Sequence, residues 1–294
     1  MEWLQTTLEA LGETVTAERR EHLSGAVTLM AAQPNVRLRT MTELVRDLSS
    51  RAPDLALALR PFTAGEPYGS IFDGNDAGSL EWRRWTMFDI QHLLKLRPEA
   101  TVPAIAHLMN LVRSRFDGRP TLLYLDEVPD WVGNKSLERL VIKVVDTDRK
   151  NNVRAVLTGQ TPSQMAKFPD LMASVKSGCA TKIYGPDGEA RTQMDAYADL
   201  GVSAPEVEAL ASLAIGSYLL RNRFGARIFD LKPGPIALAL TGMSSPQELA
   251  LLADLHERCS DADEVLSELL KAKGLSADAL RLSGWQQQAK RKVA

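Results

Sequence analysis

The stretch that decides the fold is Thr121-Leu-Leu-Tyr-Leu-Asp-Glu127, a compact apolar run that ends in two carboxylates. Such a run, bounded by polar residues, is typical of a strand that is covered on both faces of a parallel sheet. A second apolar run, Val153-Arg-Ala-Val-Leu157, ends in Thr158-Gly-Gln-Thr161. The segment between the two runs, from about 136 to 150, predicts a helix. Strands separated by a helix of this length favour right-handed crossovers, so we expect an α/β fold with a mainly parallel sheet flanked by helices.

The rest of the chain divides into helical and mixed segments. Helix starts are predicted at Thr16, at the capping box Thr40-Met-Thr-Glu43 and at Pro53. Further predicted elements are a helix over 98–115, strands over 85–89 and 180–184, a hairpin of 218–221 with 226–230, and helices from 246 onward. We therefore predict three regions: a helical segment over 1–65, a core over 66–245, and C-terminal helices with a basic tail (Lys290-Arg-Lys) over 246–294.

Composition excludes several classes of protein. The 294 residues are 45% hydrophobic and 24% charged, which is ordinary for a globular protein and excludes disorder and coiled coils. The formal net charge of −2 gives no global attraction to nucleic acid or to an anionic bilayer. Two cysteines do not make a disulfide framework, and no apolar run reaches the roughly 18 residues of a membrane-spanning helix. We expect a soluble cytoplasmic protein.

The polar residues after the two central runs suggest a chemistry. Ligands of an open parallel sheet bind beyond the carboxyl ends of its strands. There Asp126 could hold the water shell of Mg²⁺, Glu127 could orient and polarise an attacking water, and Gln160 could position that water. An apolar strand that ends in Asp-Glu also occurs by chance, and the combination with Gln160 is the more informative signal.

An ordered series of segments resembles one family. Asp117-Gly-Arg-Pro-Thr-Leu-Leu-Tyr-Leu-Asp-Glu127, Asp148-Arg-Lys-Asn-Asn152 and Thr158-Gly-Gln-Thr-Pro162 are similar to the C-terminal ATPase domain of the CagE/TrbE/VirB family. Upstream, Gly69-Ser-Ile-Phe-Asp73 and Met87-Phe-Asp89 follow the same order. The family comprises the ATPases of conjugal transfer and type IV secretion, so the resemblance implies a RecA-like P-loop fold.

The resemblance also implies roles for individual residues. Asp126 would be the Walker B residue that holds magnesium through water, Glu127 the catalytic glutamate, and Gln160 a catalytic sensor. Arg149 would act as an arginine finger that meets phosphate charge in trans at a subunit boundary. Two further residues would contact the nucleotide, Lys150 beside that arginine and Thr161 beside the sensor. Without a functional role, Arg149 and Lys150 would be cations at a solvated helix end.

The phosphate cradle of such an enzyme is absent from these 294 residues. No G-x-x-x-x-G-K-[S/T] motif occurs, although its backbone amides and lysine hold the phosphates. The family carries this loop upstream of the helices that begin here, so we expect a core that is incomplete at its N-terminus, a truncated chain, and negligible ATP hydrolysis by the chain alone. The missing strand would also leave an exposed sheet edge.

Gly159 and Val128-Pro-Asp130 depart from the family pattern. The family usually has a β-branched or small hydroxyl residue before the glutamine, and an aromatic segment after the acidic pair.

The resemblance implies partners and leaves alternatives open. It implies ATP and Mg²⁺ as cofactors of the complete domain, a homohexamer with P-loop-bearing subunits, and other secretion components as partners at the inner face of the bacterial inner membrane. One alternative is a non-enzymatic module that docks onto the full-length ATPase. Another is a fragment of a RecA-like DNA translocase, against which the near-neutral charge counts. No direct nucleic-acid contact is expected.

Two weaker patterns have simpler explanations. His256-x-x-Cys259 lacks further ligands at a spacing suited to zinc. Glu81-Trp-Arg-Arg-Trp85 interleaves aromatic and basic residues, and we interpret it as a turn-to-strand segment that packs its two tryptophans.

Overall fold

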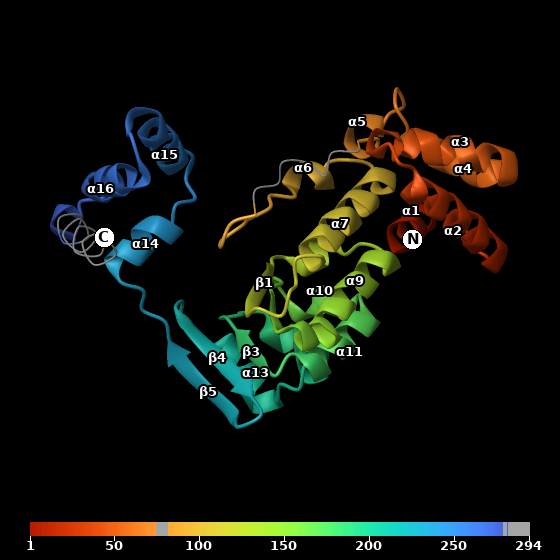
Figure 1. The fold of residues 1–294 in the computed structure, drawn as a ribbon. Helices are drawn as coiled ribbons and strands as arrows, with labels where there is room; N and C mark the ends of the chain where they lie inside the picture. The colour runs from red at the N-terminus through yellow and green to blue at the C-terminus, as the bar shows by residue number, and fades with distance from the viewer. Residues whose placement is uncertain (75–81, 279–280, 282–294) are drawn as a thin grey trace. The chain divides into compact units, whose positions relative to one another are not determined.

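The computed structural model describes residues 1–74, 82–278 and 281, and these divide into two compact units (Figure 1). The first unit comprises 1–182 and 188–211, and the second comprises 183–187 and the chain from 212 onward. The division into 1–65, 66–245 and 246–294 stays a prediction.

The first unit holds helices and a pair of strands. In chain order they are α1 (Glu2–Ala10), α2 (Ala17–Ala32), α3 (Met41–Arg51), α4 (Pro53–Leu59), α5 (Gly69–Phe72), α6 (Gln91–Leu94), α7 (Pro98–Arg113), β1 (Thr121–Leu125), α8 (Val128–Trp131), α9 (Lys135–Asp146), β2 (Val153–Leu157), α10 (Pro162–Ala166), α11 (Pro169–Gly178), α12 (Met194–Asp199) and α13 (Ala204–Ala211). The short strand β3 (Thr181–Tyr184) crosses the boundary, and the second unit continues with β4 (Ser217–Asn222), β5 (Gly225–Asp230), α14 (Pro235–Thr241), α15 (Pro246–Arg258) and α16 (Ala262–Ala272).

The predicted helix starts are confirmed. The Thr16 side chain accepts a hydrogen bond from the backbone of Arg19 and caps α2, and Thr40 does the same for α3. Pro53 is the first residue of α4, where its missing N–H leaves no hydrogen bond unmade.

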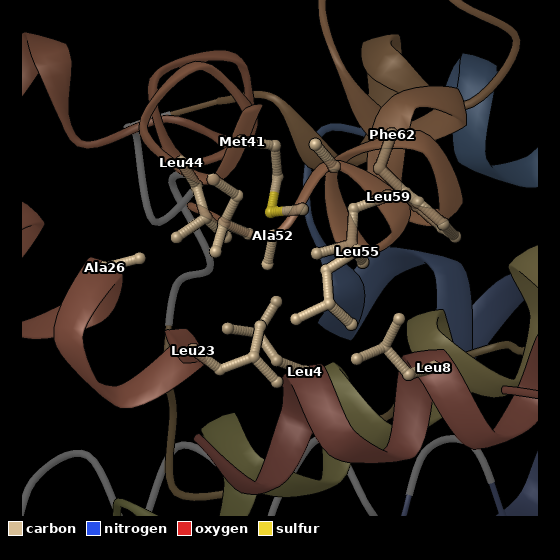
Figure 2. Close-up of a cluster of buried hydrophobic side chains, with 12 residues drawn as sticks. Leu4, Leu8, Leu23, Ala26, Met41, Leu44, Ala52, Leu55, Leu59 and Phe62 are labelled. Carbon is tan, nitrogen blue, oxygen red and sulfur yellow. The ribbon is translucent and has the colours of Figure 1, made fainter. Parts of the chain in front are cut away.

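Leucines bury the faces of the first four helices against one another (Figure 2). The buried cluster contains Leu4, Leu8, Leu23, Ala26, Met41, Leu44, Leu48, Ala52, Leu55, Ala56, Leu59 and Phe62. The helices therefore share one apolar core.

Helix α1 also joins this cluster to the central region of the first unit, where α7 and α9 lie (Figure 1). The indole Nε1 of Trp3 donates to the carbonyl oxygen of Pro103 on α7 at 2.8 Å. Toward α9, the hydroxyl of Ser136 donates to Glu9 at 2.6 Å. The N-terminal helices are thus packed onto the elements that surround the central strands.

Strands β1 and β2 pair in parallel, as predicted, from Thr121 opposite Val153 to Leu125 opposite Leu157. The expectation that β1 is covered on both faces is wrong. Leu122 and Tyr124 point to the same face, and they are 64% and 57% exposed. Among the described residues the cover lies on the opposite face, where α9 contacts β2. Within the described residues β1 pairs with β2 alone, so its other edge is open.

The strand predicted over 85–89 does not form. Arg83 and Thr86 instead close a turn, in which the backbone N–H of Arg83 donates to the Thr86 hydroxyl at 3.1 Å. Trp85 and Met87 are both 82% exposed, and no strand among the described residues pairs with this segment. The interpretation of two packed tryptophans is therefore wrong for Trp85. Trp82 does pack, with its ring 5.7 Å from that of Phe88.

The second unit confirms the predicted hairpin and the C-terminal helices. Strands β4 and β5 pair antiparallel around Gly225, whose φ of +126° suits glycine, and β3 lies beside β4. Helices α15 and α16 bury Leu255 against Leu269. The basic tail at 290–292 lies outside the described residues.

No helix in the part of the chain that the structure describes is both long and apolar enough to cross a membrane. Strands β1 and β2 are parallel and are connected through helix α9, so the predicted α/β class is confirmed.

Candidate functional site

The predicted carboxylate pair and the predicted glutamine lie together at the carboxyl end of β1 and β2. Parallel pairing brings the ends of the two strands level, so the residues after Leu125 and Leu157 meet. The amide nitrogen Nε2 of Gln160 donates to Oε1 of Glu127 at 3.3 Å. Asp126, Glu127 and Gln160 are all exposed, so a ligand in solution can reach them.

Thr158 links the two carboxylate residues, and the sequence did not single it out. Its hydroxyl donates to Oδ1 of Asp126 and accepts from the backbone N–H of Glu127, the latter at 2.9 Å. The only available signal was its position as the first residue after β2.

Glu127 has an unusual backbone. Its φ of 46° and ψ of 47° fall in the left-handed region, which non-glycine residues rarely adopt. This bend directs the chain from β1 into the short helix α8. The indole Nε1 of Trp131 on α8 donates back to the carbonyl oxygen of Asp126 at 2.9 Å. The strand end is therefore fixed by several hydrogen bonds.

The site has donors that suit magnesium and lacks those that hold phosphate. Exposed carboxylates at a strand end are the oxygen ligands through which proteins bind Mg²⁺, usually with several of its waters retained. A phosphate cradle needs a row of backbone amides with a lysine, and residues 1–294 contain no such motif. The carboxylates at the end of β1 are thus suitable ligands for Mg²⁺. The motif that would bind the phosphates of a nucleotide does not occur in residues 1–294.

Thr161 directly follows Gln160 in the chain, but its hydroxyl oxygen already caps α10. It accepts from the backbone N–H of Gln164 at 3.4 Å and contacts the hydroxyl of Ser163 at 3.0 Å. A nucleotide-binding role for Thr161 stays a prediction.

Arg149 and Lys150 lie at the opposite end of the strands. They belong to a short 3-10 turn, Asp148–Asn151, which precedes β2. A five-residue strand spans about 16 Å, so the structure does not bring these cations to the carboxylate pair of the same chain. Both are exposed. Their predicted action in trans stays a prediction.

The turn that carries these two cations is anchored by a buried ion pair. Arg113 of α7 donates to Asp148 through Nε at 2.7 Å and through Nη2 at 2.9 Å. Asp148 is only 1% exposed and Arg113 17%. The hydrogen bond to Asp148 raises the pKa of Arg113 further above its ordinary value. Because both partners are charged and the contact is bidentate, the geometry of the turn is well defined.

No group of three or more potential metal ligands occurs in the described part of the chain, counting His, Cys, Asp and Glu. His256 and Cys259 are near the end of α15, where Cys259 packs against the α15–α16 core.

Comparison with known proteins finds relatives in conjugal transfer and type IV secretion. No family model matches the chain. The chain is 28% identical over 258 residues to the conjugal transfer protein TrbE of Rhizobium radiobacter, a match that covers 87% of this chain and 31% of that protein. It is 30% identical over 242 residues to the protein virB4 of Rhizobium radiobacter, covering 79% of this chain and 30% of the relative. The chain thus spans about a third of the length of the curated relatives that it matches.

A solved structure shows the same fold. VirB4 of Thermoanaerobacter pseudethanolicus superposes with a TM-score of 0.64 over 80% of this chain and 69% of that one, at 15% sequence identity. The identity is too low to carry more than the fold, which is the expected RecA-like α/β fold. The resemblance predicted from the motifs is therefore confirmed, and the chain is a relative of the conjugal transfer and type IV secretion proteins TrbE and VirB4.

Proposed function

We propose that this chain supplies the magnesium-holding and water-activating portion of an ATP-hydrolysing site in a conjugal transfer or type IV secretion ATPase. The observation that carries the proposal is the meeting of Asp126, Glu127 and Gln160 at the ends of two parallel strands. Asp126 would hold Mg²⁺ through its water shell, and Glu127 would orient the attacking water. Gln160, which contacts Glu127, would position that water against the terminal phosphate.

The chain would need a P-loop from outside residues 1–294. Magnesium in such sites is held by the Walker B aspartate together with a hydroxyl of the P-loop, so the loop has to lie beside the end of β1. A P-loop is preceded by a strand and followed by a helix. The two-stranded sheet is open along the outer edges of both β1 and β2, and either edge offers a place for that strand, in parallel. The exposed apolar face of Leu122 and Tyr124 offers a surface for that helix.

The resemblance to conjugal transfer and type IV secretion proteins supports a proposal on partners. We propose that the chain works with P-loop-bearing ATPase subunits in a homo-oligomer, a hexamer, at the cytoplasmic face of the inner membrane and next to other secretion components. In that assembly Arg149, supported by Lys150, would approach the nucleotide site of a neighbouring subunit, because both lie far from the carboxylate pair of their own chain.

The open edges of this sheet also favour a second function, a non-enzymatic module that docks onto the ATPase. Docking would use the same open strand edge and exposed apolar face, but it would not contribute to ATP hydrolysis. The two functions therefore agree on binding and differ in hydrolysis.

A complementation experiment separates them. The conjugal transfer protein TrbE of Rhizobium radiobacter, 28% identical over 258 residues, would be expressed without its matched region and mixed with the present chain. Under the enzymatic proposal neither protein turns over ATP alone, and the mixture does. Glu127→Gln abolishes turnover, whereas Asp130→Asn, which alters another exposed acid three residues on, retains it. A stable complex without turnover would establish docking and refute the enzymatic role. Steady turnover by the present chain alone would refute the need for an outside P-loop.

A further inference from the structure

The backbone of Thr158 fixes it to the end of β1 from both sides. Its N–H donates to the carbonyl oxygen of Leu125 at 3.0 Å, and its carbonyl oxygen accepts from the N–H of Val128 at 3.0 Å. The first bond is the last of the β1–β2 ladder, and the second ties Thr158 to the first residue of α8. The hydroxyl of Thr158 is therefore held at a defined place between Asp126 and Glu127.

From this position the hydroxyl forms hydrogen bonds with both acidic residues. A hydroxyl has one hydrogen to donate and two lone pairs to accept with. Here the hydrogen goes to Oδ1 of Asp126, and a lone pair accepts the backbone N–H of Glu127. One contact fixes the carboxylate proposed to hold magnesium, and the other fixes the backbone of the proposed base.

The bond to Glu127 matters because of that residue's left-handed backbone. A non-glycine residue adopts this conformation only when its surroundings hold it there. The N–H of Glu127 is held by Thr158, and its side chain then meets Gln160. The contact between Glu127 and Gln160 is thus made from a backbone conformation that the Thr158 hydroxyl supports.

We propose that Thr158 is the positioning residue of the acidic pair, and that its hydroxyl couples the orientation of the Asp126 carboxylate to the backbone conformation of Glu127. The catalytic consequence of this inference rests on the proposed function. The structural coupling does not, and it can be measured on the isolated chain. Thr158 would touch neither magnesium nor nucleotide.

Two variants of Thr158 and one control separate positioning from general stability. Thr158→Val keeps the shape and removes the hydroxyl, and Thr158→Ser keeps the hydroxyl. Thr121→Val is the matched control, because the Thr121 hydroxyl lies on the same strand pair and donates only to the backbone of Arg119. Hydrogen exchange of the Glu127 amide, measured by NMR on the chain alone, is the first readout.

The expected result is local. In Thr158→Val the Glu127 amide exchanges about tenfold faster, the change that the loss of one hydrogen bond gives. Thr158→Ser and Thr121→Val leave that rate unchanged. An unchanged rate in Thr158→Val overturns the proposal, and so does a serine variant that behaves like the valine variant. An equal rise at the α9 amides also overturns it, because the hydroxyl would then serve stability alone.

The complementation mixture gives the second readout. Thr158→Val is expected to lower kcat by about tenfold or more with little change in KM for ATP, since it disturbs water activation rather than phosphate binding. A faster local exchange together with no turnover in any mixture would leave the coupling intact and refute the proposed function. Normal kcat in Thr158→Val would overturn the positioning role.

Discussion

A Cβ atom at position 159 would lie 3.2 Å from Cγ and 3.3 Å from Cδ of Pro129. Gly159 and Pro129 are both places where this sequence departs from the pattern of the family that it resembles. The structure shows that the two departures touch each other across the site. The proline ring fills the space that a side chain at 159 would need, and the hydroxyl next to Asp126 comes from residue 158.

This contact predicts a coupling between the two positions. Gly159→Ala is expected to destabilise the chain by about 1 kcal/mol, because a rigid ring beside the fully buried Val128 has little room to move. In a Pro129→Ala background the same change is expected to cost nothing or to stabilise slightly, since alanine restricts the unfolded chain. Urea unfolding of the four proteins of this double-mutant cycle measures the coupling. Equal costs in both backgrounds would show that the contact carries no strain.

The open face of β1 predicts a specific effect on complementation. Leu122→Lys should leave the isolated chain folded, because the side chain is 64% exposed, and should weaken binding to the P-loop-bearing portion of TrbE by about tenfold or more. Leu57→Lys is the matched control, since Leu57 is 69% exposed on α4, away from the strands. Isothermal titration calorimetry measures both affinities.

The outcome also identifies the occupant of this face. Equal affinities for the two lysine variants would place docking elsewhere. Self-association of the unmodified chain, seen by sedimentation and abolished by Leu122→Lys, would mean that the face packs against a second copy instead.

The buried pair of Arg113 and Asp148 predicts asymmetric costs. Arg113→Met leaves a carboxylate that is 1% exposed without its partner, so it is expected to lower the free energy of unfolding by about 3–5 kcal/mol. Asp148→Asn should cost less, because Arg113 still has an oxygen to contact and some access to water. Denaturant unfolding tests this order. If Arg113→Met were as stable as Asp148→Asn, the charge of Asp148 would have to be compensated by a group other than Arg113.

Local patterns made much of the fold predictable. The caps at Thr16 and Thr40, the proline that opens α4, and the paired strands each depend on a few neighbouring residues, and all of them form as predicted. The meeting of Glu127 with Gln160 followed from parallel pairing alone, because that pairing aligns strand ends.

Features set by distant contacts were not predictable. The apolar pattern of β1 indicated burial on both faces, but the described residues supply cover for only one. The 85–89 run has strand-like residues, yet among the described residues it has no strand to pair with. The left-handed Glu127 depends on a hydroxyl 31 residues away, and Asp148 is buried by an arginine 35 residues away. A sequence motif gives the residue types at neighbouring positions, whereas these contacts depend on which distant segments the fold brings together.

The second unit predicts an acid-sensitive contact between its helices. Lys273, at the end of α16, contacts Glu248 in the first turn of α15, where Glu248 also forms the capping box with Ser245. The hydrogen bond from Lys273, together with those from Ser245, lowers the pKa of Glu248 from 4.5 to about 2. A carboxyl whose pKa is lower in the folded state adds stability that is present above its unfolded pKa. That contribution is lost as the pH falls from about 4.5 to about 2.

We therefore expect the α15–α16 pair to loosen over this pH range, measured by amide chemical shifts at both helices. Glu248→Gln keeps a capping side chain but carries no charge, so it should remove most of this pH dependence. Glu257→Gln, a change at an exposed acid on the same helix, should leave it in place. If Glu248→Gln and the unmodified chain lose the contact at the same pH, the acid sensitivity must come from another carboxylate.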